Sequence, residues 1–326
     1  KQLFAQVSNP PLDAIREELV TSLEVNLGEV RNLLDETPEH SRQLKLPYPV
    51  LSSEDLERVR SIDVNGIRAR TLSALFSLED SPGSLEKAVD RLCDEAAQAA
   101  RDGYGIIVIS DRGVDAEHAP IPSLLATSVV HHHLIREDLR MKVGLVVESG
   151  EPREVQHFAL LVGYGASAIN PYLALETIEE MAGLGILSNG TDSHIFEENF
   201  IKAMHKGVLK VASKMGISTV QGYRGAQIFE AVGLNQETVD RYFTWTPSRV
   251  GGVGLDEIEE ECRERHDFAY LEFGGAGSRR LRPGGQYQWR RDGEYHMWNP
   301  ETIATLQESV RSNSFETYRA FADSVD

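Results

Sequence analysis

Two apolar runs, Gly105–Ser110 (GIIVIS) and Val143–Glu148 (VGLVVE), decide the fold class of this chain. Each run has the length of a strand and is continuously apolar, as expected of a strand that is buried on both faces. Strands of this kind belong to parallel sheets, because parallel strands need helical crossovers that cover the sheet. The two runs therefore predict an α/β domain built on a parallel sheet.

The sequence around these runs alternates between strand and helix patterns. Strands are also expected at 69–77, 166–170 and 217–221, and helices at 85–101, 122–136, 151–162, 172–182, 197–215, 226–232 and 236–243. The alternation gives five or six βα units between residues 69 and 232, whereas a complete barrel needs eight. Periodicity alone leaves two alternatives, a large part of a barrel or an open doubly wound sheet.

Composition shifts divide the chain into three parts. Residues 1–65 are mixed and interrupted by prolines, residues 66–260 carry the βα units, and residues 261–326 hold Gly-rich loops, an Arg cluster and two further helices at 302–311 and 315–323. We expect the last part to be less ordered than the βα body when a neighbouring domain is absent. Its aromatic side chains would be buried against that neighbour: Tyr287, Trp289, Tyr295 and Trp298.

Charge and composition exclude several classes of protein. The net charge of −18 argues against nucleic-acid binding, which depends on neutralising phosphates. The longest apolar runs have about eight residues, too few to span a bilayer, and no signal peptide is recognised, so we expect a cytoplasmic location. The chain starts with Lys1, which favours a segment of a longer protein. The two cysteines, Cys93 and Cys262, are expected to be free thiols, too few for an iron–sulfur cluster.

Polar residues follow the predicted strands, at the edge where barrel enzymes carry their chemistry. They are Ser110, Asp111, Arg112, Glu148, Asn170 and Gln221. Glu148 could act as a base, but no Lys ends a strand to form a Schiff base and no carboxylate cluster suggests a metal. We therefore favour a rim of polar residues that satisfy one another over a catalytic site.

Three adjacent histidines, His131, His132 and His133, raise the question of a metal site. Successive helical residues point about 100° apart, so the three rings cannot converge on one ion. His132 shares a helix face with Leu125, Ser128, Ile135 and Leu139, which we predict to face inward. A hydrogen-bonded core histidine is the favoured interpretation.

Two further patterns are open to more than one interpretation. Lys202, Lys206, Lys210 and Lys214 recur every four residues along one helix, as a solvated face or as a docking face for an acidic surface. The motifs 252–254 (GVG) and 275–277 (GAG) could open a dinucleotide fingerprint, but Glu257 and Arg280 stand where its third glycine belongs. Loops without a cofactor role are therefore expected.

Several segments together resemble the central domain of the glutamate synthase large subunit. The resemblance extends in order along essentially the whole chain: QVSNPP (6–11), IREE (15–18), SDRG (110–113), HFALLVGYGA (157–166), NPYLA (170–174), KG (206–207), SKMGIST (213–219), YRGAQIFE (223–230), SRVGG (248–252) and GEYHMWNP (293–300). In that family an amidotransferase domain releases ammonia from glutamine. The ammonia passes internally to an FMN- and 3Fe-4S-containing barrel, where 2-oxoglutarate becomes glutamate.

The resemblance implies what this chain does and what it lacks. The family's central domain is a rudimentary relative of the FMN barrel, so we predict an incomplete or degenerate TIM-barrel-like fold for the βα repeats. The chain carries neither the amidotransferase cysteine nor a cluster motif, so no catalytic, cofactor-binding or metal-binding residue is assigned. FMN and the cluster are expected elsewhere in the parent enzyme, whose amidotransferase and FMN domains are the expected partners.

The resemblance thus implies a non-catalytic scaffold that joins those two domains and walls part of the ammonia route, with 105–110 and 143–148 as apolar wall strands. The isolated chain is expected to be inactive. The alternative is a free-standing TIM-barrel enzyme that could bind flavin and that uses the polar residues at the strand ends.

Overall fold

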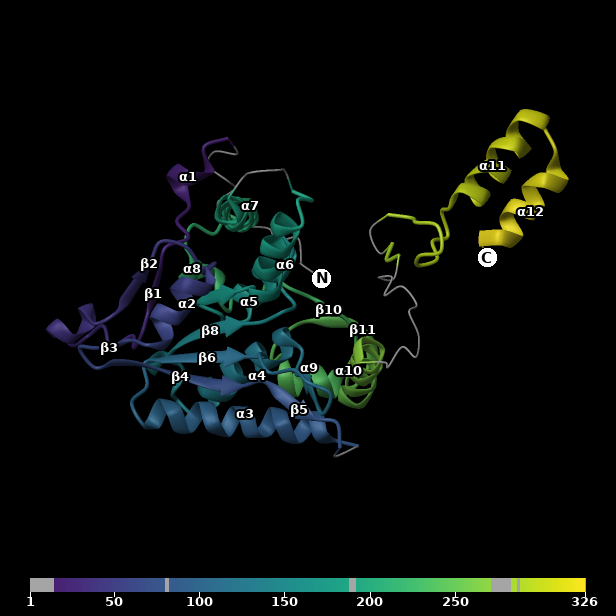
Figure 1. Cartoon of the computed structure of the whole chain (residues 1–326). Coiled ribbons are helices and arrows are strands. Elements are labelled where there is room, and N and C mark those ends of the chain that lie inside the picture. Colours follow the sequence, from purple (N-terminus) through teal and green to yellow (C-terminus); the bar gives the residue numbers. More distant parts are fainter. Residues whose placement is uncertain (1–14, 80–81, 188–191, 271–282, 286–287, 326) are drawn as a thin grey trace. The chain divides into compact units, whose positions relative to one another are not determined.

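The computed structural model describes residues 15–79, 82–187, 192–270, 283–285 and 288–325 (Figure 1). It divides into two compact units, Lys1–Tyr270 and Leu271–Asp326, which are described separately. The boundary that the sequence places at residue 260 falls inside a continuous helix, α10 (Leu255–Tyr270).

A five-stranded sheet forms the centre of the first unit. Its order is β3 (Asp63–Val64), β4 (Ile67–Ser73), β6 (Ile106–Ser110), β8 (Gly144–Glu148) and β9 (Ala168–Asn170). The last four strands are parallel and lie in chain order, whereas β3 pairs antiparallel with β4. Every residue of β6 and β8 is buried, which confirms the two central strands.

Helices and an N-terminal segment cover the two faces of this sheet. One face packs on α3 (Ser84–Arg101) and α4 (Ser123–Arg136), with Ile107, Ile109 and Leu145 in that core. The other face packs on β1 (Val25–Leu27), β2 (Leu44–Leu46) and α2 (Ser53–Arg60), with Ile106 and Val108 in that core. Figure 1 shows α3 and α2 on opposite sides of the strands. The alternation of side chains along β6 therefore divides the apolar core into two layers.

The described part of this unit has further α-helices besides α2, α3, α4 and α10. They are α1 (Glu17–Val20), α5 (Val155–Gly163), α6 (Tyr172–Gly183), α7 (Ser193–Lys214), α8 (Val220–Tyr223) and α9 (Gln236–Tyr242). The expected helices over 85–101, 122–136, 172–182, 197–215 and 236–243 are confirmed within a few residues. The helix expected over 151–162 begins later, at Val155. Glu151 lies before it and accepts hydrogen bonds from Ser123.

The edge of the sheet beyond β9 differs from the expectation. The strand predicted over 217–221 is wrong, because Thr219 accepts a hydrogen bond from Gly222 N and caps α8 instead. The N-terminal segment lies beside β9 in its place: Ile169 N donates to Pro49 O at 2.7 Å, and Leu51 N donates to Ile169 O at 2.9 Å. The described strands of the central sheet thus supply four parallel βα units between residues 69 and 232 rather than five or six, and a closed barrel is not seen among them.

The strand expected over 69–77 is two strands. β4 ends at Ser73, and β5 (Leu75–Ser77) pairs antiparallel with β7 (His118–Pro120) in a separate ribbon. Ala74 separates the two strands, with its N–H on Ser110 O and its C=O on Ile121 N. The sequence over 69–77 has the same β pattern throughout, so it does not predict that β4 pairs with β6 whereas β5 pairs with β7.

The helix expected over 226–232 and the loop expected around Gly252 are also wrong. β10 (Ala231–Leu234) and β11 (Ser248–Val253) form a small parallel sheet. A Cβ at Gly252 would lie 2.2 Å from Gly233 O, so glycine is needed for the strands to approach. Glu257, in the first turn of α10, accepts from Gly254 N at 2.7 Å and so caps the start of that helix. The motif at 275–277 lies outside the described residues.

The second unit contains a helical hairpin of α11 (Pro300–Ser312) and α12 (Phe315–Val325). Asn299 and Thr302 form a capping box at the start of α11, and Asn313 ends it in a left-handed conformation. Trp298 lies 6.0 Å from Phe321 between ring centroids but keeps half of its surface exposed, and Tyr295 is exposed. Trp289 is also exposed, and Tyr287 lies outside the described residues.

Candidate functional site

The carboxyl ends of the parallel strands bring the predicted polar residues to one edge of the sheet. Ser110 pairs with Glu148 across β6 and β8, and Glu148 pairs with Asn170 across β8 and β9. Asp111 and Arg112 follow β6 directly. The register therefore unites five of the six candidates, whereas Gln221 lies exposed on α8, away from this sheet.

Glu148 is the centre of this edge and is almost completely buried. Oε1 accepts from Arg112 Nε at 2.7 Å, while Oε2 accepts from Arg60 Nη2 and from the Ser110 hydroxyl. Arg112 also donates to Glu176 at 2.8 Å. Both carboxylate oxygens are thus engaged by donors, and two guanidiniums neutralise the charge. A carboxylate held in this way is a poor general base, because its lone pairs already face donors.

Asp111 forms a second buried carboxylate site beside the first. It accepts from Ser149 Oγ at 2.6 Å and from Gly150 N at 3.1 Å. Burial raises the pKa of Asp111 to about 6, although the hydrogen bonds from Ser149, Tyr172 and Gly150 oppose the shift. The side chain holds the turn that follows β8, which is a structural task.

Internal carboxylates occupy the N-termini of the two helices that cover one face of the sheet. Glu151 accepts from Ser123 N at 2.7 Å and from its hydroxyl at 2.6 Å at the start of α4. Glu259 accepts from Leu85 N and from Ser84 Oγ, both at 3.1 Å, at the start of α3. A helix N-terminus is the usual place for a cofactor phosphate. The protein's own side chains fill that place at α3 and α4.

The described residues do not fit the metal groups of the resembled enzyme. No three His, Cys, Asp or Glu side chains come together as ligands in the described ranges. Cys93 and Cys262 are buried free thiols, as expected, and burial raises the pKa of Cys93 to about 12. Two protonated thiols cannot hold a three-iron cluster, which needs three thiolates.

The three histidines lie on α4, and the structure modifies the predicted core face. Leu125, Ser128 and Leu139 are buried, but Ile135 is 47% exposed. His132 is half-buried and its Nδ1 lies 2.9 Å from Ser128 O, so it is hydrogen-bonded yet belongs to a cavity wall rather than to the core. Ile135 lines the same cavity as His132, so this part of the helix face is not covered by the core.

The lysine stripe on α7 is exposed along its length. Lys210 forms an ion pair with Glu17 of α1 at 2.8 Å. Lys202 and Lys206 border a cavity of about 700 Å³ whose other walls include Glu18, Glu54 and Glu197. The acidic surface that meets this stripe thus includes side chains of the chain itself.

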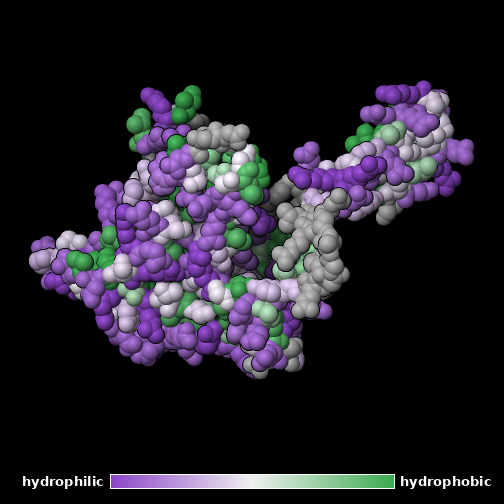
Figure 2. All heavy atoms as spheres, viewed as in Figure 1, coloured by the Kyte–Doolittle hydropathy of each residue, from purple (hydrophilic) through white to green (hydrophobic). Residues whose placement is uncertain are grey.

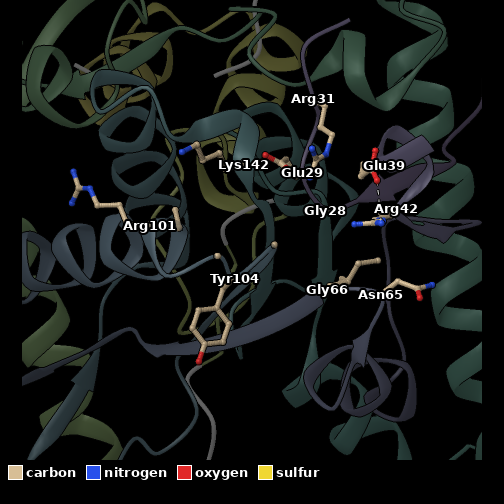
Figure 3. Close-up of a pocket in the computed structure, with 14 residues that line it drawn as sticks. Gly28, Glu29, Arg31, Glu39, Arg42, Asn65, Gly66, Arg101, Tyr104 and Lys142 are labelled. Carbon is tan, nitrogen blue, oxygen red and sulfur yellow. Dashed lines mark hydrogen bonds and ion pairs between the residues drawn. The ribbon is translucent and has the colours of Figure 1, made fainter. Parts of the chain in front are cut away.

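A cavity of about 280 Å³ lies at the opposite, amino-terminal edge of the sheet (Figure 3). Arg31 pairs with Glu29 at 3.0 Å, and Arg42 pairs with Glu39 at 3.2 Å. These bonds neutralise two of the four basic side chains labelled in Figure 3, and a third, Arg101, pairs with Glu137.

Sequence reasoning missed the residues that close the polar edge. Arg60 lies 88 residues before Glu148 at the end of α2, and Glu259 lies 175 residues after Ser84. Such pairings have no local signature. Arg263, one turn after Glu259, could have suggested an i,i+4 ion pair but not its target at α3.

No helix in the described ranges is both long enough and apolar enough to cross a bilayer.

Solved structures give a weak likeness. A mutant flavocytochrome b2 with benzoylformate aligns with a TM-score of 0.32 and 15% identity, over 41% of this chain and 31% of that chain. A likeness at this level carries no argument about fold or cofactor.

Comparisons of sequence give much stronger matches than the comparison of structures. The family described as "Glutamate synthase central domain" matches residues 1–235. The glutamate synthase [NADPH] large chain of Bacillus subtilis is 45% identical over all of this chain and 21% of its own length. The ferredoxin-dependent glutamate synthase of Oryza sativa is 42% identical over 98% of this chain and 20% of its own. This chain spans about a fifth of these relatives. It belongs to the glutamate synthase central-domain family.

Proposed function

We propose that this chain is a non-catalytic scaffold within a glutamate synthase, the enzyme that converts glutamine and 2-oxoglutarate into two glutamates. In this proposal the FMN and 3Fe-4S centres belong to other parts of the parent polypeptide. The single observation that carries the scaffold role is the closure of the strand-end edge, where Glu148 is held by Arg60, Arg112 and Ser110.

Two further observations support the proposal. The N-termini of α3 and α4, where a cofactor phosphate could bind, hold Glu259 and Glu151 instead. The relatives that match this chain are about five times longer, which favours neighbouring domains in the same polypeptide. The amidotransferase and FMN domains are the partners that we propose.

We further propose that β6 and β8 form part of the wall of an ammonia route. Both strands are apolar except at their carboxyl ends, and packed layers cover both of their faces, so they would support such a wall from behind its lining. A rigid apolar wall would restrict proton donors along the route, because ammonium does not pass as ammonia does. The packing density of a protein interior would also restrict leakage of water.

The test uses the complete parent enzyme with Glu148→Gln and, separately, Asp111→Asn. A scaffold role predicts that both variants keep the wild-type kcat for glutamine hydrolysis and for glutamate formation at a temperature where they are folded. A general base at either position would instead lose 10²–10⁴-fold in kcat.

The isolated 326-residue chain gives an independent test of the same proposal. We expect no glutamine hydrolysis and no stoichiometric flavin absorbance after gel filtration in the presence of FMN. Retention of flavin would favour the alternative, a free-standing flavin-binding enzyme. For the ammonia route, free ammonia released per glutamine consumed is the readout in the parent enzyme. We expect Val108→Ala to raise it, whereas unchanged coupling would contradict the wall.

A further inference from the structure

A cavity of about 360 Å³ lies beside α4 and α5, away from the polar edge of the sheet. Its walls come from α4, from the end of α5 and from the segments that precede β10 and β11. The lining residues are mostly apolar or aromatic and include none with a carboxylate. Those used below are His131, Arg136, Gly163, Tyr164, Phe229 and Trp245.

Aromatic rings form much of the wall. Tyr164 stacks on Phe229 with 5.5 Å between ring centroids. Gly163 permits this arrangement, because a Cβ there would lie 2.2 Å from Phe229 Cε2. Trp245 remains 78% exposed although it lines the cavity. The cavity thus offers flat apolar surfaces, one of them on a side chain that still has most of its area to bury.

Two lining residues hold conformations that are unfavourable for their type. Gln227 has φ +56° and Trp245 has φ +66°, both in the left-handed region that favours glycine. A bulky residue in this region costs roughly 1–2 kcal/mol, and such strain concentrates at ligand-binding sites. Here both strained residues lie on the same cavity.

One arginine, Arg136, lines the cavity, and two more, Arg140 and Arg224, lie near His131 of its wall. None of the three forms an ion pair with a carboxylate in the described part of the chain. Arg136 lines the cavity and donates to Thr244 Oγ1 at 3.4 Å. Arg140, behind the wall, donates to Gly165 O at 2.9 Å, and Arg224 donates to Ser167 Oγ at 2.6 Å. All of these acceptors are neutral. Positive charge therefore accumulates here in a chain whose net charge is −18.

His131 adds a hydrogen-bond donor to this wall. Its Nδ1 accepts from Arg140 Nε at 2.9 Å, so the proton of the neutral ring resides on Nε2. Burial, together with Arg140, lowers the pKa of His131 to about 2. The ring is therefore neutral at physiological pH.

We propose that this cavity binds a small organic carboxylate with a flat apolar body. The carboxylate faces Arg136, and the body packs against Tyr164, Phe229 and Trp245. The arginines select an anion, because the site presents positive charge with no carboxylate of its own to neutralise it. The aromatic walls select a planar apolar body. This site is distinct from the proposed scaffold role and does not depend on it.

The experiment is isothermal titration calorimetry of trans-cinnamate into the 326-residue chain at low ionic strength. We expect saturable binding with one site and a Kd on the order of 1 mM or tighter, as the size of the ligand allows. Cinnamamide tests the charge and acetate tests the aromatic body. Each should bind at least about tenfold more weakly than cinnamate, since each lacks one of the two groups recognised.

Two variants test the residues. Arg136→Gln should weaken cinnamate binding by about tenfold, the effect of one charge-assisted hydrogen bond. Trp245→Gly should weaken it several-fold, and the fold should persist because glycine adopts φ +66° freely. Arg58→Gln is the matched control, since Arg58 is an exposed arginine on α2 outside the cavity.

The absence of cinnamate binding at 10-fold the expected Kd would overturn the proposal. Equal binding of cinnamamide would do the same, and so would unchanged affinity in both Arg136→Gln and Trp245→Gly with native circular dichroism. Equal weakening in Arg58→Gln would also contradict it, because the effect would then report net charge alone.

Discussion

The polar edge of the sheet and the cavity beside α4 differ in how their charged side chains are paired. At the edge, Glu148 and its arginines neutralise one another inside the protein. At the cavity, Arg136, Arg140 and Arg224 have neutral partners in the described structure. The edge has the residue types of an active site but is closed, whereas the cavity has no carboxylate and remains open. Residue type alone is thus a weaker guide to a site than the pairing of its charges.

The visible surface of the molecule is mostly polar. Figure 2 shows mainly hydrophilic residues over the visible face, with hydrophobic ones between them. Exposed apolar residues of this scattered kind are normal for folded proteins. Trp245 differs from such residues because it is both exposed and part of a cavity wall.

The largest expected effect is at the closed edge. Glu148→Gln leaves Arg60 and Arg112 with a neutral acceptor in a buried position, so the free energy of unfolding should fall by about 3 kcal/mol. Denaturant unfolding measures it. Glu176→Gln is the control, because this exposed partner of Arg112 should contribute less than about 1 kcal/mol. Equal losses in the two variants would mean that Glu148 does not organise the edge.

Asp111 should make stability fall as pH rises. Its pKa is raised to about 6 by burial, above the ordinary value of 3.8, so the folded state favours the protonated carboxyl. The favourable contribution is complete below pH 4 and is lost as pH rises through 6, by about 3 kcal/mol. Asp111→Asn should remove this loss, so its advantage over wild type should grow between pH 4 and 7.

Thermal unfolding across that pH range measures the effect. Asp115 supplies the opposite case, because hydrogen bonds from Glu117 N and His118 lower its pKa. Asp115→Asn should therefore lose stability relative to wild type as pH rises toward 4, and the difference should stay constant between pH 5 and 7. A parallel response of the two variants would contradict the burial of Asp111.

A smaller effect tests how the cavity is shaped. Gly163→Ala places a Cβ against Phe229, so we expect a loss of about 1–3 kcal/mol from overpacking. Gly183→Ala, at the end of α6 with open space around it, should instead be neutral or stabilising by up to about 1 kcal/mol. Unfolding midpoints of both variants give the comparison. A stabilised Gly163→Ala protein would contradict this expectation, because it would show that Phe229 can move to accommodate the added methyl group.

The smallest effect concerns the strain at Trp245. Trp245→Gly relieves the left-handed conformation but adds freedom to the unfolded chain, so stability should change by less than about 1 kcal/mol. Leu173→Gly is the matched control, since Leu173 is also an exposed apolar residue but has a helical backbone. It should lose about 1 kcal/mol. A larger loss in Trp245→Gly would assign the indole a packing role.

Local patterns were enough to predict the buried strands and most helices of the first unit. Gly105–Ser110 and Val143–Glu148 are apolar at every position but the last, and only a strand between two covered faces buries such a run. The amphipathic pattern of 85–101 likewise predicted α3, because one apolar stripe has to face the core. The parallel strands lie in chain order, so five of the six predicted edge residues meet, whereas Gln221 does not and Arg60 was not predicted.

Contacts between distant segments decided the rest. Residues 217–221 have β-branched side chains typical of a strand, yet Pro49–Leu51 lies beside β9 and Thr219 caps a helix instead. Arg60 reaches Glu148 across 88 residues, and Arg136 meets a cavity built from four separate segments. A sequence displays the charge of each residue but not its partner. Whether Glu148 is a base or a closed ion pair therefore depends on tertiary packing, which brings the partner within reach.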